Sequence, residues 1–111
     1  MIGVVTNGYE AVQTNTLTST GIADLVDGWA ISGAEDIWKP DMRLFEIAAT
    51  RAGAKLGDGW MVGDSAADVI GGRAAGLRTV WLPHGREWPA EVPEPDHIVA
   101  TAAEAVHLIL A

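Results

Sequence analysis

The sequence predicts an α/β domain in which a parallel sheet carries helices on its faces. Short apolar runs alternate along the chain with segments of helical periodicity, which is the order that β-α-β units produce. Turn-forming residues separate these segments, and the 111 residues contain no internal repeat, low-complexity stretch or linker. With 49% hydrophobic residues, the chain is expected to fold as one domain, residues 1–111, with a core of its own.

Composition excludes several functional classes. The formal net charge is -8, whereas non-specific nucleic-acid binding needs a basic face. The chain contains no cysteine, which excludes disulfides, thiolate catalysis and cysteine-type zinc sites. No signal-peptide pattern is visible, and no apolar run approaches the ~18 residues of a membrane span. We therefore predict no nucleic-acid partner, no membrane association and a cytoplasmic location.

The first part of the chain is expected to form two strands joined by a helix. An apolar run predicts a strand over 2–5, and a second strand is expected within 26–31. The segment 9–20 has a weak helical pattern because threonine is frequent in it. Val12 and Leu17 are the residues of this helix that we expect to face a core.

The middle of the chain predicts a well-defined helix. Asp41 is a suitable N-cap, and Gly53 marks the expected end. Between them, Leu44 and Ala48 keep helical spacing, and Phe45 adds a second apolar edge.

The second half continues the alternation of strands and helices. It predicts strands at 60–62, 78–82 and 97–99, a helix at 68–75, a surface loop at 83–95 and a last helix capped by Thr101. Gly71 and Gly72 are explained by close packing of their helix. Val106, Ile109 and Leu110 are expected to be available for burial.

Five polar residues stand directly after strands or in a loop that follows one: Thr6, Asn7, Lys39, Asp64 and Asp68. In a parallel sheet the carboxyl ends of the strands meet at one edge, where ligands bind. A hydroxyl, an amide and an ammonium suit an anion such as phosphate. Two carboxylates suit a hard cation such as Mg²⁺. The sequence therefore predicts that these residues converge on one site.

Each of these residues also has a structural interpretation, and the residues alone leave both open. Thr6 and Asn7 are suitable for a local turn, and Lys39 for a solvated surface position. Asp64 is a candidate helix N-cap, and Asp68 a first-turn acid that interacts with the helix dipole.

Taken in order, these segments resemble the haloacid dehalogenase-like (HAD) hydrolase superfamily, most of whose members are phosphatases. Its second motif is similar to the stretch Val4-Val5-Thr6-Asn7-Gly8, its third to Trp38-Lys39-Pro40-Asp41, and its fourth to Val62-Gly63-Asp64-Ser65 with Asp68 after it. The resemblance implies that Thr6 and Asn7 bind phosphate, that Lys39 stabilises charge, and that Asp64 and Asp68 hold Mg²⁺. Thr6, Lys39 and Asp64 are the implied catalytic residues.

Two parts of the family pattern are absent from residues 1–111. The family begins with an Asp-x-Asp motif, whose first aspartate is the nucleophile, and it commonly carries a cap domain. The chain therefore resembles the C-terminal part of a HAD core: a three-layer, Rossmann-like parallel sheet without its first, central strand. We expect the resulting gap to be closed by direct pairing of the two flanking strands or by a homodimer, because unpaired central edges are costly.

The resemblance implies magnesium-dependent hydrolysis of a phosphate monoester on a small metabolite. Without the nucleophile motif, we expect these residues alone to be inactive and to bind Mg²⁺ weakly or not at all. The alternatives are a non-catalytic truncated remnant or a protein-binding module with the same fold.

Overall fold

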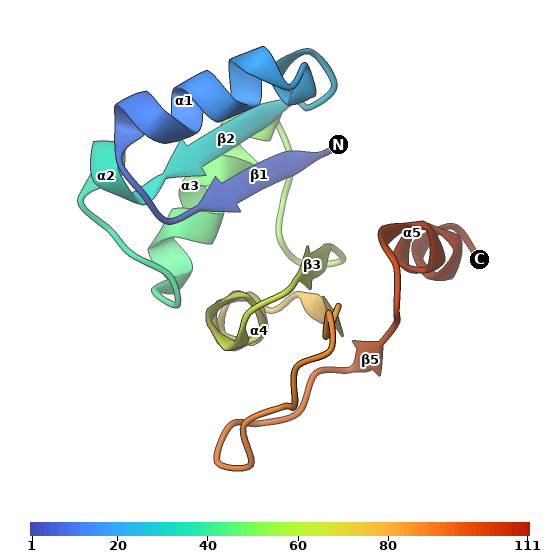
Figure 1. Ribbon diagram of the computed structural model, residues 1–111. Helices are drawn as coiled ribbons and strands as arrows, with labels where there is room; N and C mark the ends of the chain where they lie inside the picture. The colour runs from blue at the N-terminus through green and yellow to red at the C-terminus, as the bar shows by residue number, and fades with distance from the viewer.

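The computed structural model describes residues 1–111 and confirms the alternation of strands and helices (Figure 1). Its elements are β1 (Gly3–Thr6), α1 (Glu10–Ser19), the 3-10 turn η1 (Ile22–Asp24), β2 (Gly28–Ile31), α2 (Ser32–Glu35), α3 (Met42–Ala52), β3 (Trp60–Gly63), α4 (Ala66–Ala74), β4 (Arg78–Trp81), β5 (His97–Ile98) and α5 (Ala102–Leu110). No helix combines the length and the apolar character that crossing a membrane requires.

The strands form two separate parallel sheets. One contains β1 and β2, with Gly3 opposite Gly28 and Thr6 opposite Ile31. The other has the order β3-β4-β5. β1 and β3 are not paired with each other, so of the two expected ways to close the gap direct pairing is wrong, and closure by a homodimer stays a prediction. A parallel ladder needs strands about 4.8 Å apart, whereas a cavity of about 360 Å³ lies between these two strands and is lined by residues of both.

Helix α3 covers one face of the β1–β2 sheet. It begins after Asp41, whose carboxylate accepts a hydrogen bond from the Arg43 backbone N–H at 3.0 Å, and it ends at Gly53 with a φ of 73°. Its residues Leu44 and Ala48 are buried against Ala30 of β2, as the spacing predicted. Figure 1 shows α1 on the opposite side of this sheet.

Helix α4 joins the two sheets through its glycines. A Cβ placed on Gly71 would lie within 2.7 Å of ring atoms of Phe45 in α3. A Cβ on Gly72 would meet Met61 of β3 at 2.9 Å and Thr79 of β4 at 3.2 Å. The absent side chains therefore let α4 contact both α3 and the second sheet, which confirms the close packing predicted for this pair.

Several sequence predictions need correction. Val12 is 58% exposed, because α1 is mostly threonine and other polar residues and has no continuous apolar face; only Leu17 is buried. Val106 and Leu110 of α5 are also exposed, at 53% and 79%. Ala105 is the buried residue of α5, and β5, the strand that precedes this helix, is only two residues long.

Candidate active site

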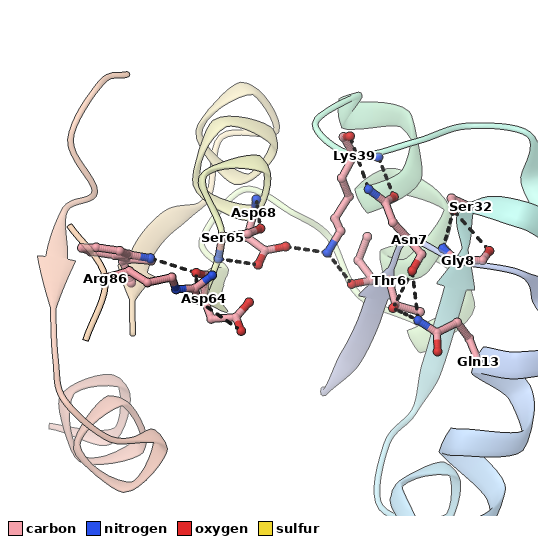
Figure 2. Close-up of polar contacts among 12 residues, drawn as sticks. Thr6, Asn7, Gly8, Gln13, Ser32, Lys39, Asp64, Ser65, Asp68 and Arg86 are labelled. Atoms are coloured by element: carbon pink, nitrogen blue, oxygen red, sulfur yellow. Dashed lines mark hydrogen bonds and ion pairs between the residues drawn. The ribbon is translucent and has the colours of Figure 1, made fainter. Parts of the chain in front are cut away.

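The end of β1 places Thr6 and Asn7 beside the loop that carries Lys39 (Figure 2). Gln13 of α1 donates from Nε2 to Thr6 Oγ1 at 2.8 Å and to the Asn7 carbonyl at 2.9 Å. The Asn7 side chain accepts from the Lys39 backbone N–H at 2.9 Å. Asn7 therefore fastens the Lys39 loop to the end of β1, although the two residues are 32 positions apart in the chain.

Lys39 is not a solvated surface residue. Its side chain is 12% exposed, and its ammonium donates to Asp68 Oδ1 at 2.6 Å and to the Val5 carbonyl at 3.2 Å. Asp68 belongs to the second sheet's helix α4 and Val5 to β1. The ammonium thus lies between the two sheets at the carboxyl ends of their facing strands, where the sequence predicted a site.

Asp68 also organises the start of α4. Its Oδ2 accepts from the Ser65 backbone N–H at 3.3 Å, and its own N–H donates to Ser65 Oγ at 3.3 Å. This reciprocal pair is a capping box, so Ser65, not Asp64, is the N-cap, while Asp68 is the first-turn acid. A Cβ on Gly63 would lie 2.3 Å from Asp68 Oδ2, which explains why glycine precedes the two acids.

Asp64 follows β3 as predicted, but its carboxylate has a different partner. Its side chain is 60% exposed and lies 3.5 Å from the Arg86 guanidinium. Its carbonyl accepts from Trp81 Nε1 at 3.1 Å and from Arg86. Figure 2 shows Asp64 on the side of Arg86 and Asp68 on the side of Lys39. The involvement of Arg86 was missed, because a lone arginine in a proline-rich loop carries no local signal for a site.

The structure therefore brings Thr6, Asn7, Lys39 and Asp68 into one connected set, with Asp64 at its margin. The ammonium and nearby donors are suited to a phosphate. No group of three or more histidine, aspartate and glutamate side chains is arranged to hold a metal. Mg²⁺ commonly uses only one or two protein carboxylates together with water and phosphate oxygens. In this structure the Asp68 carboxylate pairs with Lys39 and the Asp64 carboxylate lies near Arg86.

Comparison with known proteins decides the family. The sequence pattern of the HAD-hydrolase-like family matches residues 37–105. The chain belongs to this family. The match includes Lys39 of the stretch that resembles the third motif, and Asp64 and Asp68 of the stretch that resembles the fourth.

Characterised relatives of the chain are phosphatases. The pyrimidine 5'-nucleotidase YjjG of Escherichia coli is 38% identical over 97% of this chain and 49% of its own length. The phosphoserine phosphatase of Thermus thermophilus is 39% identical over 76% of this chain and 34% of its own length. Residues 1–111 therefore span about half or less of the length of these relatives.

Solved structures agree on the fold. The HAD hydrolase YfnB of Bacillus subtilis, which was crystallised with magnesium, has a TM-score of 0.83 and 25% identity over 96% of this chain and 48% of its own. A HAD phosphatase from Thermococcus onnurineus gives a TM-score of 0.76 and 26% identity over 87% of this chain and 45% of its own. The two separate sheets thus belong to a HAD core, as the sequence predicted.

Proposed function

We propose that residues 1–111 form the phosphate- and magnesium-binding part of a phosphatase that acts on a small phosphorylated metabolite in the cytoplasm. The observation that carries this proposal is the Lys39–Asp68 contact of 2.6 Å, which sets an ammonium and a carboxylate between the ends of β1 and β3. The relatives support the reaction class, since a nucleotidase and a phosphoserine phosphatase both cleave phosphate esters.

Within this proposal each side chain has a defined task. The Thr6 hydroxyl and the Asn7 region hydrogen-bond phosphate oxygens at the end of β1. The Lys39 ammonium neutralises charge on the phosphate, and its bond to Asn7 through the backbone N–H fixes the loop from which it reaches inward. Asp64 and Asp68 would hold Mg²⁺, which polarises a phosphoryl oxygen when bound.

Phosphate transfer also needs a nucleophile, and residues 1–111 contain no Asp-x-Asp motif. Removing a nucleophile costs many orders of magnitude in rate. We therefore propose that these residues alone bind phosphate without hydrolysing esters, and that Mg²⁺ binding is weak until further carboxylates join Asp64 and Asp68.

The experiment is a titration of inorganic phosphate and Mg²⁺ into isotopically labelled chain, followed by backbone amide shifts. Shifts are expected at Thr6, Asn7 and Lys39, and Lys39→Met should remove them. Lys55→Met is the matched control, because it deletes the same charge from an exposed position. Thr6→Val is a second test, because it removes the hydroxyl proposed to bind phosphate and keeps the Lys39–Asp68 ion pair intact. Equal phosphate shifts in the chain and in Lys39→Met would contradict the proposed site.

Activity is tested separately with p-nitrophenyl phosphate. No turnover above background is expected from residues 1–111. Turnover that disappears with Asp64→Ala and with a chelator would show that these residues are a complete catalyst and that the proposed division of the site is wrong.

A further inference from the structure

Gln13 is a polar side chain of α1 that reaches the end of β1 and has no part in the tasks proposed above. Its Nε2 lies 2.8 Å from Thr6 Oγ1 and 2.9 Å from the Asn7 carbonyl oxygen. Figure 2 shows Gln13 on the side of Thr6 away from Asp68. Gln13 therefore lies behind Thr6 and not among the groups proposed to contact phosphate or Mg²⁺.

The contact between Gln13 and Thr6 requires the glycine at position 8. A Cβ placed on Gly8 would lie 2.9 Å from both Cγ and Nε2 of Gln13, whereas non-bonded heavy atoms pack at about 3.5–4.0 Å. A side chain at position 8 would therefore force the Gln13 side chain to shift. The glycine after Asn7 leaves the space through which Gln13 reaches Thr6.

The two contacts of Gln13 fix the direction of its hydrogen bond with Thr6. A carbonyl oxygen only accepts hydrogen bonds, so the Gln13 atom beside the Asn7 carbonyl is the NH₂ nitrogen and not the amide oxygen. The same nitrogen faces Thr6 Oγ1. Because an amide NH₂ group only donates, the Thr6 hydroxyl accepts in this pair, and its own proton needs a separate acceptor.

The chain offers the Thr6 proton a long hydrogen bond. Thr6 Oγ1 lies 3.5 Å from the Asn7 carbonyl oxygen, whereas O–H···O hydrogen bonds normally measure about 2.5–3.0 Å. The Gln13 amide already donates to that carbonyl at 2.9 Å. The Thr6 proton is therefore available to a stronger acceptor, such as a phosphate oxygen at the end of β1.

We propose that Gln13 is a positioning residue of the phosphate site. Its amide holds the Thr6 hydroxyl as a hydrogen-bond donor to phosphate, and it occupies the Asn7 carbonyl to which the hydroxyl would otherwise turn. Without this amide, the hydroxyl donates to the Asn7 carbonyl and its proton is lost to the phosphate. The inference rests on the proposed function, since it needs a phosphate beside Thr6.

The turn after β1 has other hydrogen bonds that hold its backbone. The Gly8 N–H donates to Ser32 Oγ at 2.9 Å, and the Gly8 carbonyl accepts from the Gly33 N–H at 3.0 Å. Ser32 is fully buried at the end of β2. Because these bonds fix the turn from the side of β2, removal of the Gln13 amide should release the Thr6 hydroxyl and leave the turn in place.

The test is a double-mutant cycle on the affinity for inorganic phosphate, titrated into the isotopically labelled chain and followed at the Lys39 amide. Gln13→Met removes the donor and should weaken phosphate binding about tenfold, as expected for the loss of one hydrogen bond to a charged group. In a Thr6→Val chain the same substitution should change the affinity by less than about twofold, because the hydroxyl is absent. Asn15→Met, at an exposed position of the same helix, is the matched control and should bind like the parent chain.

The side-chain amide of Gln13 gives a second readout in the same spectra. Its two Nε2 protons have separate resonances, and Thr6→Val should move one of them upfield and leave the proton bonded to the Asn7 carbonyl in place. Phosphate should move the first resonance in the parent chain but not in Thr6→Val, because hydrogen bonds in a chain polarise one another. If Gln13→Met fails to fold, this pair of spectra still decides the question.

The outcomes separate this inference from the proposed function. Phosphate binding of equal affinity in the parent chain and in Gln13→Met would overturn the inference and leave the proposed function standing. An equal effect of Gln13→Met with and without the Thr6 hydroxyl would overturn it too, since Gln13 would then act on the backbone. A Gln13 resonance that ignores Thr6→Val would show that the amide does not donate to the hydroxyl. Absence of phosphate shifts in the parent chain would overturn both the proposed function and the inference.

Discussion

Lys39→Met is expected to destabilise the chain by about 3 kcal/mol. The ammonium pairs with Asp68 at 2.6 Å, and the two side chains are only 12% and 6% exposed. Breaking a buried ion pair by removing one partner typically costs about 3–5 kcal/mol, because the remaining charge stays buried without compensation. We expect the lower end of this range, since the Ser65 N–H still donates to the Asp68 carboxylate.

The double variant Lys39→Met/Asp68→Asn separates this penalty from the loss of packing. It removes both charges, while the asparagine oxygen can still accept from the Ser65 N–H and close the start of α4. Replacement of a complete buried pair is often close to neutral, so the double variant should recover most of the loss. Lys55→Met, at an exposed position, should stay within about 0.5 kcal/mol of the parent chain.

Urea unfolding followed by tryptophan fluorescence measures these differences through the midpoint and slope of the transition. Only 18 of 111 residues are buried, which places the total stability near the low end of the usual range of about 5–15 kcal/mol. A loss of 3 kcal/mol is therefore a large part of the total and is readily measured. A Lys39→Met chain as stable as Lys55→Met would refute the reasoning, because it would mean that the Asp68 charge needs no buried partner.

Other predictions concern helix packing, one surface carboxylate and magnesium. Gly71→Ala should lower the free energy of unfolding by about 1–3 kcal/mol, measured by thermal unfolding, because the added methyl group overlaps the buried Phe45 ring. Gly57→Ala is the control and should be neutral, since its methyl group enters open space. Equal effects of the two substitutions would contradict the packing argument. Hydrogen bonds from Thr79, the backbone N–H first, hold the pKa of Asp96 below its ordinary value. Asp96→Ala should therefore lower stability by about 1 kcal/mol at pH 7, since solvent screens a side chain that is 42% exposed. This difference from the parent chain should decrease as the pH falls from about 4 through the lowered pKa, and a difference in urea midpoint that does not change with pH would exclude this cause. Calorimetry should find no micromolar Mg²⁺ binding to residues 1–111 alone, and a micromolar dissociation constant would contradict the incomplete ligand set.

The order of elements was predictable because its signals are local. Apolar runs and the turn residues after them identify a strand wherever it later lies in the sheet. The rule that ligands bind at the carboxyl ends of parallel strands then placed Thr6, Asn7 and Lys39 together correctly. It did so without any information on the bonds between them, which join residues about 30 positions apart.

The remaining features depend on contacts that no local pattern specifies. The sequence predicted Asp64 and Asp68 equally as ligands of Mg²⁺. Only the folded chain shows that Asp64 pairs with Arg86 and Asp68 with Lys39. Both Asp64 and Ser65 are good N-cap residues, and the close approach of Asp68 selected Ser65. Likewise, strand propensities do not specify which strands pair, so they could not predict that β1 and β3 stay separate.

The division into two sheets also determines how unfolding spreads through the molecule. The half with β1, β2 and α3 and the half with β3, β4 and α4 share no backbone ladder. The two halves contact each other through side chains, among them the Phe45 ring against Gly71 and the Lys39–Asp68 ion pair. Unfolding is cooperative only when the unfolding of one region destabilises the neighbouring region. We therefore expect each half to open by itself. Substitutions at Gly71 or Lys39 should alter the cooperativity of unfolding while leaving the hydrogen-bonded ladder within each half in place.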